Sequence, residues 1–385
     1  MKINIPYGAL EGCRFPLVPL GAMANFTSGW TPSSKNPAYY GGVNKWATIA
    51  DLNSHYISDT RQRISDVAVR DAGYPKLSNP GDLLFSFKLS VGMASIVSSP
   101  MYTNEAIATF RPSRYLDAGF AYYAFPVFLS AAARPNIYGA PLLSASLISR
   151  SRVPRLSLME QRRIADYLDD EVREMDTLIA DLEELVDNLA RRKQVLLEER
   201  INRQGGTVPV SKAKLLVGIA TGEGDTQDAL DGGEYPFYVR SDTVRSTDRW
   251  THRGPAVLTS GDGAGVGKIF HFAQGRFRAH QRVYVLNNFH GVDPKYFFWC
   301  FKCNFPKQVE HGGAMATVES VRMNMVADTE VPIPSIRQQC ETAMRLDRET
   351  AEMEFLIKEA TELIENLKAR KTALITEVVT GRKKV

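Results

Sequence analysis

A long segment of this chain occurs twice: residues 153–201 recur without a gap at 331–379. The match pairs Gln161 with Gln339, and a match of this length indicates a duplicated structural unit. The chain therefore alternates variable blocks with copies of one conserved segment. We expect two globular domains and two helical segments, with these boundaries: 1–155 and 207–333 for the globular domains, and 156–206 and 334–385 for the helical segments.

Each copy of the repeat begins with a capping-box pattern, Ser157-x-x-Glu160 and Ser335-x-x-Gln338. No proline or glycine follows for more than forty residues in either copy. A helix of that length is a rod of roughly 65 Å at ~1.5 Å per residue. We therefore expect each copy to be a spacer rather than part of a compact core.

Heptad spacing within each helix predicts a coiled-coil seam. Glu171 and Arg192, with their counterparts Glu349 and Arg370, interrupt the apolar positions. An antiparallel pair would set Glu171 against Arg370 and Arg192 against Glu349, which avoids like charges at the seam; alternatively, the charged ends extend out of the seam into solvent. The predicted seam residues are Leu168, Glu171, Met175, Leu178, Leu182, Leu185, Leu189, Arg192, Leu346, Glu349, Met353, Leu356, Leu363, Leu367 and Arg370.

The composition is that of a soluble, cytoplasmic protein, with 385 residues of which 44% are hydrophobic. The longest apolar stretch, 120–133, contains Pro126 and is too short to span a membrane. The N-terminus lacks the pattern of a signal peptide. One C-x-x-C pair, Cys300 and Cys303, lies in an aromatic run without a second ligand pair, so we predict helix packing and no metal site.

Charge differs strongly between the segments. Residues 1–155 carry 15 basic and 8 acidic side chains, whereas residues 156–206 carry 8 and 13. In the second block, 207–333, the charges nearly balance but the arginines cluster along the chain. A basic globular block joined to an acidic helix suggests a polyanion as partner of the block and a protein as partner of the helix.

The two variable blocks share a common plan of short strands, turns and one aromatic helix. Leu116-Asp117-x-x-Phe120 in the first block matches Val292-Asp293-x-x-Tyr296 in the second, and Gly29 corresponds to Gly222. One scaffold with two different surfaces is what we expect of two domains that read different sequences. The predicted fold class is α+β, with two mixed α/β recognition domains and a long antiparallel two-helix coiled coil related by an internal pseudo-two-fold.

Sequence motifs of enzymes are missing from the chain. The glycine run 261–267 resembles a phosphate loop, but Asp262 stands where the first glycine belongs and Ile269 follows Lys268. No G-x-S-x-G, H-E-x-x-H or amino-methyltransferase motif occurs. We therefore predict a non-catalytic protein that binds no cofactor of its own.

The chain resembles the DNA specificity subunits of type I restriction-modification systems. The resemblance depends on Glu160-Gln161-x-x-Ile164-Ala165-x-x-Leu168-Asp169, on Met175-Asp176-x-Leu178-Ile179, and on the ending Leu374-Ile375-x-x-Val378-Val379-Thr380-Gly381. It covers the whole architecture, because the family alternates two target recognition domains with two helical conserved regions.

The resemblance implies double-stranded DNA as ligand and an asymmetric, bipartite target with one half-site per recognition domain. It also implies two modification subunits that bind S-adenosylmethionine and methylate DNA, together with restriction and motor subunits. Residues expected at the DNA are polar or basic side chains of loops. They are Asn44, Lys45, Lys88, Arg134, Asn136 and Tyr138 in the first block, and Arg240, Arg245, Lys268, Arg278 and His311 in the second.

Two other functions remain open on the sequence. A coiled-coil scaffold without DNA specificity would have the same helices but would bind only proteins. A self-sufficient methyltransferase or nuclease is disfavoured by the missing motifs. Selection of a split motif from random duplexes separates recognition from scaffolding, and binding of S-adenosylmethionine by the isolated chain would favour an enzyme.

Overall fold

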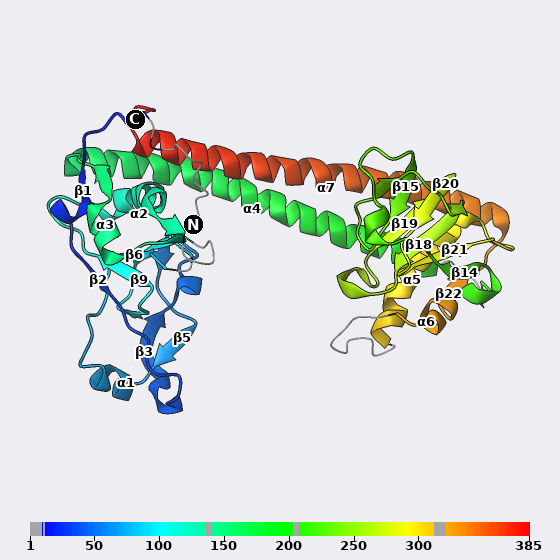
Figure 1. The fold of residues 1–385 in the computed structure, drawn as a ribbon, viewed down its shortest axis with the longest axis horizontal. Helices are drawn as coiled ribbons and strands as arrows, with labels where there is room; N and C mark the ends of the chain where they lie inside the picture. The colour runs from blue at the N-terminus through cyan, green and yellow to red at the C-terminus, as the bar shows by residue number, and fades with distance from the viewer. Residues whose placement is uncertain (1–9, 11, 89, 136–140, 203–207, 312–320) are drawn as a thin grey trace. The chain divides into compact units, whose positions relative to one another are not determined.

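The computed structural model describes residues 10, 12–88, 90–135, 141–202, 208–311 and 321–385. Two helices dominate the chain, α4 (Leu158–Asn202) and α7 (Ile336–Val379). The chain forms two compact units, and each unit contains part of both long helices (Figure 1). Unit 1 comprises 1–182 and 362–385, and unit 2 comprises 183–361.

The described residues of unit 1 form four small sheets, with the strand orders β2-β9-β6-β7-β4, β5-β3-β8, β1-β12 and β10-β11. Three shorter helices accompany them: α1 (Asp66–Asp71), α2 (Ala118–Phe128) and α3 (Ala145–Arg150). The strands are β1 (Leu17–Pro19), β2 (Phe26–Ser28), β3 (Tyr40–Ala47), β4 (Tyr56–Ile57), β5 (Gln62–Ile64), β6 (Leu83–Ser86), β7 (Ala94–Val97), β8 (Tyr102–Thr103), β9 (Ile107–Phe110), β10 (Arg134–Pro135), β11 (Pro141–Leu142) and β12 (Arg152–Pro154).

In the part of unit 2 that the structure describes there are three sheets, with the orders β14-β21-β18-β19, β16-β15-β20-β17 and β13-β22. Its shorter helices are α5 (Pro294–His311) and α6 (Met323–Ala327). The strands are β13 (Val210–Lys212), β14 (Gly218–Thr221), β15 (Tyr235–Tyr238), β16 (Arg245–Thr247), β17 (His252–Arg253), β18 (Ala256–Ser260), β19 (Phe270–Ala273), β20 (Arg276–Ala279), β21 (Val283–Asn287) and β22 (Glu330–Pro332).

The sheets of the two units follow one topology. The antiparallel order β2-β9-β6-β7 returns as β14-β21-β18-β19, and β5-β3-β8 returns as β16-β15-β20 with the same antiparallel and parallel pairings. Gly29 and Gly222 occupy equivalent places: an added Cβ would lie 1.8 Å from the carbonyl oxygen of Thr103 at Gly29, and 2.2 Å from that of Ala279 at Gly222. The duplication therefore includes the globular parts, as the sequence predicts.

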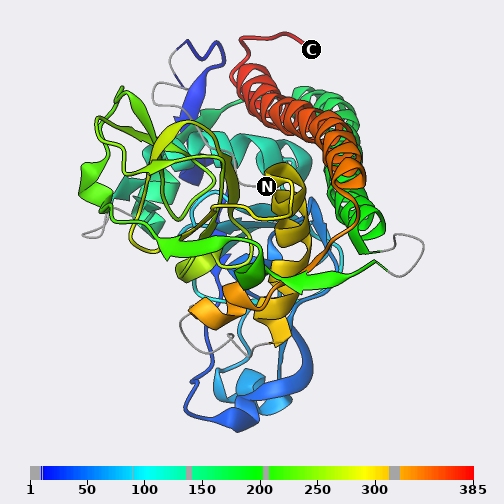
Figure 2. The same cartoon turned by 90° about the vertical axis from the view of Figure 1, so that its right-hand side faces the viewer.

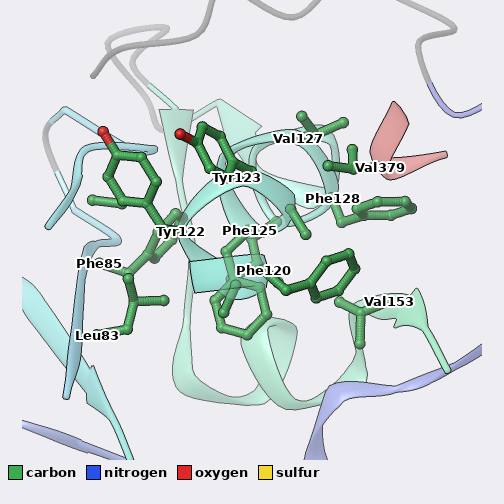
Figure 3. Packing of buried hydrophobic residues seen from close by; sticks show 14 of the residues in the cluster. Leu83, Phe85, Phe120, Tyr122, Tyr123, Phe125, Val127, Phe128, Val153 and Val379 are labelled. Carbon is green, nitrogen blue, oxygen red and sulfur yellow. The ribbon is translucent and has the colours of Figure 1, made fainter. Parts of the chain in front are cut away.

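An aromatic helix packs against a long helix in each unit. Helix α2 presents Phe120, Phe125 and Phe128 to a core that includes Val153 and Val379 (Figure 3). In unit 2 the aromatic side chains of α5, among them Phe297 and Phe301, pack into a core with Leu346 of α7. These two clusters bury the apolar faces of both the sheets and the long helices, and burial of this kind is the main stabilising contribution to a fold.

The same two polar contacts fasten the aromatic helix to the long helix in both units. In unit 1, the buried Gln161 side chain accepts a hydrogen bond from the Asp117 amide at 2.9 Å, and Asp169 accepts one from the Tyr123 hydroxyl at 2.6 Å. In unit 2, Gln339 accepts from the Asp293 amide at 2.8 Å, and Asp347 accepts from the Trp299 indole at 2.8 Å. The paired positions of the repeat thus make equivalent contacts.

Both predicted capping boxes form. The Ser157 amide donates to Glu160 at 2.9 Å and the Glu160 amide donates to the Ser157 hydroxyl at 3.2 Å. Ser335 and Gln338 make the same reciprocal pair at 3.1 and 3.4 Å. The two helix starts are therefore correctly predicted, because a capping box is a purely local signal.

Helices α4 and α7 are antiparallel within each unit, which confirms the predicted fold class. In unit 1 the Lys371 ammonium lies 2.5 Å from Asp176, and in unit 2 the Lys193 ammonium lies 2.5 Å from Glu354. These two ion pairs are equivalent under the repeat. The helices run side by side in both views (Figure 1 and Figure 2).

The predicted seam is half correct. The structure places Leu168, Met175, Leu182, Leu189, Leu346, Met353 and Leu367 on the buried or half-buried face. It exposes Leu178, Leu185, Leu356 and Leu363, together with Arg192 and Arg370. The row that completes the seam instead contains Val172, Ile179, Val186, Ile357 and Ile364. The row with Leu178 and Leu185 and the row with Val172 and Ile179 each repeat every seven residues, and each lies next to the row with Leu168 and Met175. Heptad spacing alone therefore does not decide which of the two is buried.

The predicted charge pairs at the seam are also wrong. Glu349 is paired with Arg200 at 3.1 Å rather than with Arg192, a shift of about two helical turns. Arg192 and Arg370 lie outside the seam, and Lys193 and Lys371 occupy it instead. Their long aliphatic chains cover the apolar surface while the ammonium groups reach a carboxylate on the other helix.

Among the described helices, none combines the length and the apolar character that a membrane span requires.

Candidate nucleic-acid interface

Basic side chains converge where several strands of unit 2 end. Arg240 follows β15, Asp262 follows β18, and Arg282 immediately precedes β21. The Gly261 amide donates to the Arg282 carbonyl at 2.8 Å, which ties two of these strand ends together. Side chains that are about twenty residues apart in the sequence thus meet at one edge.

Asp262 holds two arginines at this edge. Its two carboxylate oxygens accept hydrogen bonds from Arg240 Nη1 at 2.7 Å and from Arg282 Nη1 at 2.5 Å. Partial burial by itself raises the pKa of Asp262, but the two guanidinium groups outweigh it and hold the pKa below its ordinary value. The carboxylate is therefore ionised at neutral pH and fixes the orientation of both guanidinium groups.

The Arg240–Asp262–Arg282 cluster remains open to a ligand. The side chains of Arg240 and Arg282 are 42% and 59% exposed, whereas that of Asp262 is 19% exposed. A guanidinium has five N–H donors, and one Asp contact leaves others for a planar acceptor pair such as guanine O6 and N7, or for phosphate. The cluster can therefore present two oriented forks to nucleic acid.

The adjoining glycine run forms a tight turn and not a phosphate loop. Gly263 adopts a φ of +74°, and the amides of Val266 and Lys268 donate to the carbonyls of Gly263 and Gly265 at 3.1 Å. These amides are used within the turn and do not converge on an anion. Lys268 follows the glycine run in the sequence, and its side chain is exposed. Its ammonium group can bind phosphate as a point charge.

The other predicted residues of unit 2 lie in different surroundings. Arg278 is mostly buried, and its Nη2 donates to Asp228 at 2.6 Å. Arg245 lies on the exposed part of β16. His311 ends α5, and its side chain lies outside the described residues. The structure thus brings Arg240 to the edge with Arg282, leaves Lys268 exposed in the adjoining turn, and gives Arg278 an internal partner.

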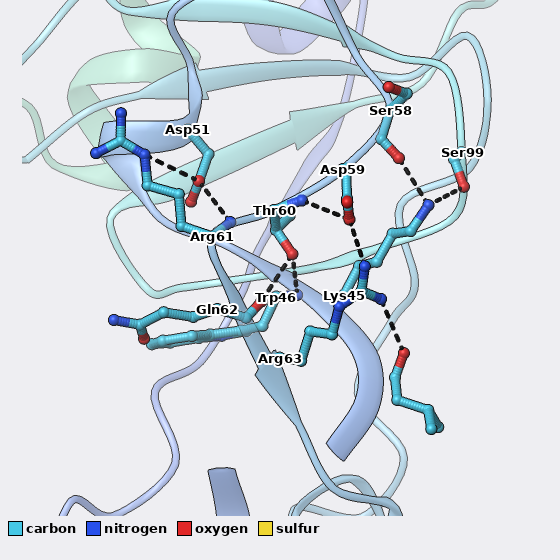
Figure 4. A network of polar contacts seen from close by, with 11 residues as sticks. Lys45, Trp46, Asp51, Ser58, Asp59, Thr60, Arg61, Gln62, Arg63 and Ser99 are labelled. Atoms are coloured by element: carbon cyan, nitrogen blue, oxygen red, sulfur yellow. Dashed lines mark hydrogen bonds and ion pairs between the residues drawn. The ribbon is translucent and has the colours of Figure 1, made fainter. Parts of the chain in front are cut away.

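In unit 1 the predicted residues Asn44 and Lys45 lie on β3 beside β5. Lys45 Nζ donates to the Ser58 carbonyl at 2.6 Å and to the Ser99 hydroxyl at 2.8 Å (Figure 4). Asn44 donates to Asp66 at 2.7 Å. Both side chains are held by the protein itself, so only their outer faces are available to a ligand.

The remaining predicted residues of unit 1 are scattered. Lys88 lies over the Phe87 ring at 5.3 Å, and Arg134 is exposed on β10. Asn136 and Tyr138 lie outside the described residues. In the described part of the chain, these predicted side chains form no single cluster comparable to that of unit 2.

Some candidate residues escaped the sequence prediction. Asp262 and Arg282 were not expected at the interface, although Arg282 belongs to the basic cluster visible in the sequence. Arg63, which pairs with Asp59 at 2.7 Å next to Lys45, was not expected there either. The signal for Arg282 lies in the strand topology, because the antiparallel β18–β21 pairing brings it next to Gly261, the residue before Asp262.

Comparisons with known proteins point in one direction. No protein-family model matches the chain. It is 28% identical over 166 residues to the EcoDI type I restriction enzyme specificity subunit of Escherichia coli, which is 43% of this chain and 36% of that protein. It is 26% identical over 177 residues to the MjaIX specificity subunit of Methanocaldococcus jannaschii, which is 44% of this chain and 38% of that protein.

The aligned residues thus span little more than a third of these relatives. Among solved structures, a chain from a type I restriction-modification system, studied for its assembly and conformational transition, matches 95% of this chain and 97% of its own length. The TM-score is 0.69 at 17% identity, so this likeness concerns the fold. The chain therefore has the fold of a type I restriction-modification component and is similar in sequence to type I restriction enzyme specificity subunits.

Proposed function

We propose that this chain is the DNA specificity subunit of a type I restriction-modification complex. Each unit reads one half of a bipartite target, and the chain itself performs no catalysis. Modification subunits bind S-adenosylmethionine and methylate the DNA, and restriction and motor subunits complete the assembly. The complex acts in the cytoplasm.

The observation that carries this proposal is the duplication of the scaffold with divergence of the surface. Both units share strand order and the contacts of their aromatic helix. Their basic groups differ: an Arg–Asp–Arg cluster in unit 2 and a lysine held by neutral oxygens in unit 1. Two domains of one design with different polar edges suit the recognition of two different half-sites.

The exposed leucines of the long helices support a protein partner for each unit. Leu178 and Leu363 in unit 1 are 44% and 45% exposed, and Leu185 and Leu356 in unit 2 are 44% and 50% exposed. Each unit thus offers one such leucine from each long helix, at positions equivalent under the repeat. We assign these positions to two modification subunits, one for each unit, because an apolar side chain at a repeated surface position suits an equivalent contact.

Selection from a random duplex pool tests recognition directly. The chain is mixed with its modification subunits, and bound duplexes are sequenced. Enrichment of two short motifs separated by a fixed unread spacer supports the proposal. A pool that stays random, although the complex assembles, supports the alternative of a coiled-coil scaffold without DNA specificity.

Methylome sequencing of a host with and without the gene provides a second test. Methylation at one bipartite motif should disappear with the gene and return with a plasmid copy.

Replacing Leu178 and Leu363 by Glu, or Leu185 and Leu356 by Glu, should release one modification subunit in each case. Size-exclusion chromatography with light scattering measures the number that remains bound.

A further inference from the structure

A cavity of about 480 Å³ lies in unit 1. It is lined by the segment 21–27, which leads into β2, by Lys76, by Thr109 of β9 and by the segment 111–115 that follows β9. Strands β2 and β9 are paired antiparallel, with Thr27 opposite Thr109, so the backbone beneath the cavity is a continuous ladder. None of the residues assigned to DNA in the preceding sections lines this cavity.

The lining of the cavity carries one sign of charge. Lys76, Arg111 and Arg114 all contribute to it, and among the described lining residues there is no carboxylate. Arg111 has an acidic partner outside the lining, the buried Asp82, which lies 3.9 Å from Arg111 Nε and accepts a hydrogen bond from the Asn79 amide at 2.9 Å. Three positive charges around one hollow repel one another, and an anion in the hollow would remove that cost.

Both guanidinium groups are positioned by a neighbour. Asp82 faces the Nε side of Arg111, and the guanidinium carbon of Arg114 lies 4.7 Å from the centre of the Tyr115 ring. Stacking on an aromatic ring leaves the N–H edges of an arginine free to donate in the plane. Planar forks of this kind suit phosphate oxygens, and a lysine adds a point charge.

We propose that this cavity binds a phosphate group. The source is either the backbone of a nucleic-acid strand that extends past the base-reading edges, or a free polyphosphate such as that of a nucleotide. The first source depends on the proposed function, whereas the second does not. Because phosphate carries no base identity, the cavity contributes affinity and register but no sequence preference.

Calorimetric titration of the full chain with tripolyphosphate tests the free source. The double variant Arg111→Gln/Arg114→Gln removes both forks, and Arg70→Gln is the matched control, because Arg70 and Arg111 are each 62% exposed and Arg70 lies outside the cavity. Saturable binding that weakens at least about tenfold in the double variant and is unchanged in the control supports a free polyphosphate.

Salt dependence of duplex binding tests the backbone source. A plot of log K against log salt should lose about 0.9 in slope for each phosphate contact removed, or roughly 1.8 for the double variant, while the preference for one sequence stays unchanged. The proposal is overturned if tripolyphosphate does not bind and the slope of the double variant equals that of Arg70→Gln. A complex that selects no motif but binds tripolyphosphate would contradict the proposed function and leave this cavity assignment standing.

Discussion

The two units are alike where they join the long helices and different at their outer polar edges. At the joints, Gln161 and Gln339 occupy the same place and accept a hydrogen bond from the residue that caps the aromatic helix. At the outer edges, Lys45 of unit 1 is held by a carbonyl and a hydroxyl, whereas Arg240 of unit 2 is held by a carboxylate. The joint must preserve the fold, whereas the polar edge is free to diverge between the units.

The largest expected effect concerns Gly29 and Gly222. Replacing either by Ala places a Cβ about 2 Å from a backbone carbonyl oxygen, at 1.8 and 2.2 Å respectively, so the strand must move. We expect each substitution to destabilise the protein by about 3 kcal/mol. Differential scanning calorimetry measures the change, and a loss below about 1 kcal/mol at either site would show that the two positions are not equivalent.

The buried glutamines come next. Gln161→Ala leaves the Asp117 amide and the carbonyls of Tyr115 and Leu156 without their side-chain partner, whereas Gln339→Ala removes two such contacts, to Asp293 and Pro334. We expect losses of about 2–3 kcal/mol, with the larger at Gln161. Chemical denaturation of both variants measures the difference.

The control for the glutamines is Gln338→Ala, in which the exposed capping-box side chain is removed. A cap of this kind is worth about 1 kcal/mol. If Gln161→Ala is no more destabilising than Gln338→Ala, the repeated glutamine does not fasten the aromatic helix.

The Arg–Asp–Arg cluster provides the sharpest test of the difference between the edges. Arg240→Ala or Arg282→Ala should weaken cognate binding by about 1–3 kcal/mol and relax the preference at one half-site only. Asp262→Asn should raise non-specific affinity, because a negative charge is lost, and lower specificity, because the guanidinium groups are no longer oriented.

Selection from random duplexes measures the sequence preference of all three variants. The control is Arg253→Ala, because Arg253 is exposed on β17. Relaxed preference at both half-sites would mean that the cluster acts through the fold of the whole chain. An unchanged motif for both Arg240→Ala and Arg282→Ala would remove the cluster from the interface.

Sequence reasoning succeeds here where the signal is local or repeated. The capping boxes and the long helices follow from residue spacing, and the common plan of the two blocks follows from the Asp117 and Asp293 motifs. The antiparallel order of the helices is correct, although the charge pairs from which it was predicted do not form. The seam was predicted wrongly because the heptad row of Leu178 and that of Val172 lie on either side of the row of Leu168. Leucine was preferred over valine and isoleucine, and this preference selected the exposed row. It cannot find the partnership of Asp262 with Arg282, since strand pairing alone creates it.

The smallest effect is expected from the seam lysines. Lys193→Met and Lys371→Met remove the ion pairs with Glu354 and Asp176, each of which is about half exposed, and leave an apolar side chain in the seam. Exposed pairs contribute about 0.2–1 kcal/mol, and the gain in apolar packing offsets part of that loss. Because the two pairs are equivalent under the repeat, the free energy of unfolding should change equally in both variants and by less than about 1 kcal/mol. Thermal unfolding measures this change. A large loss for one variant alone would show that the repeat has diverged at its seam as well as at its edges, and would limit the equivalence of the units to the joints.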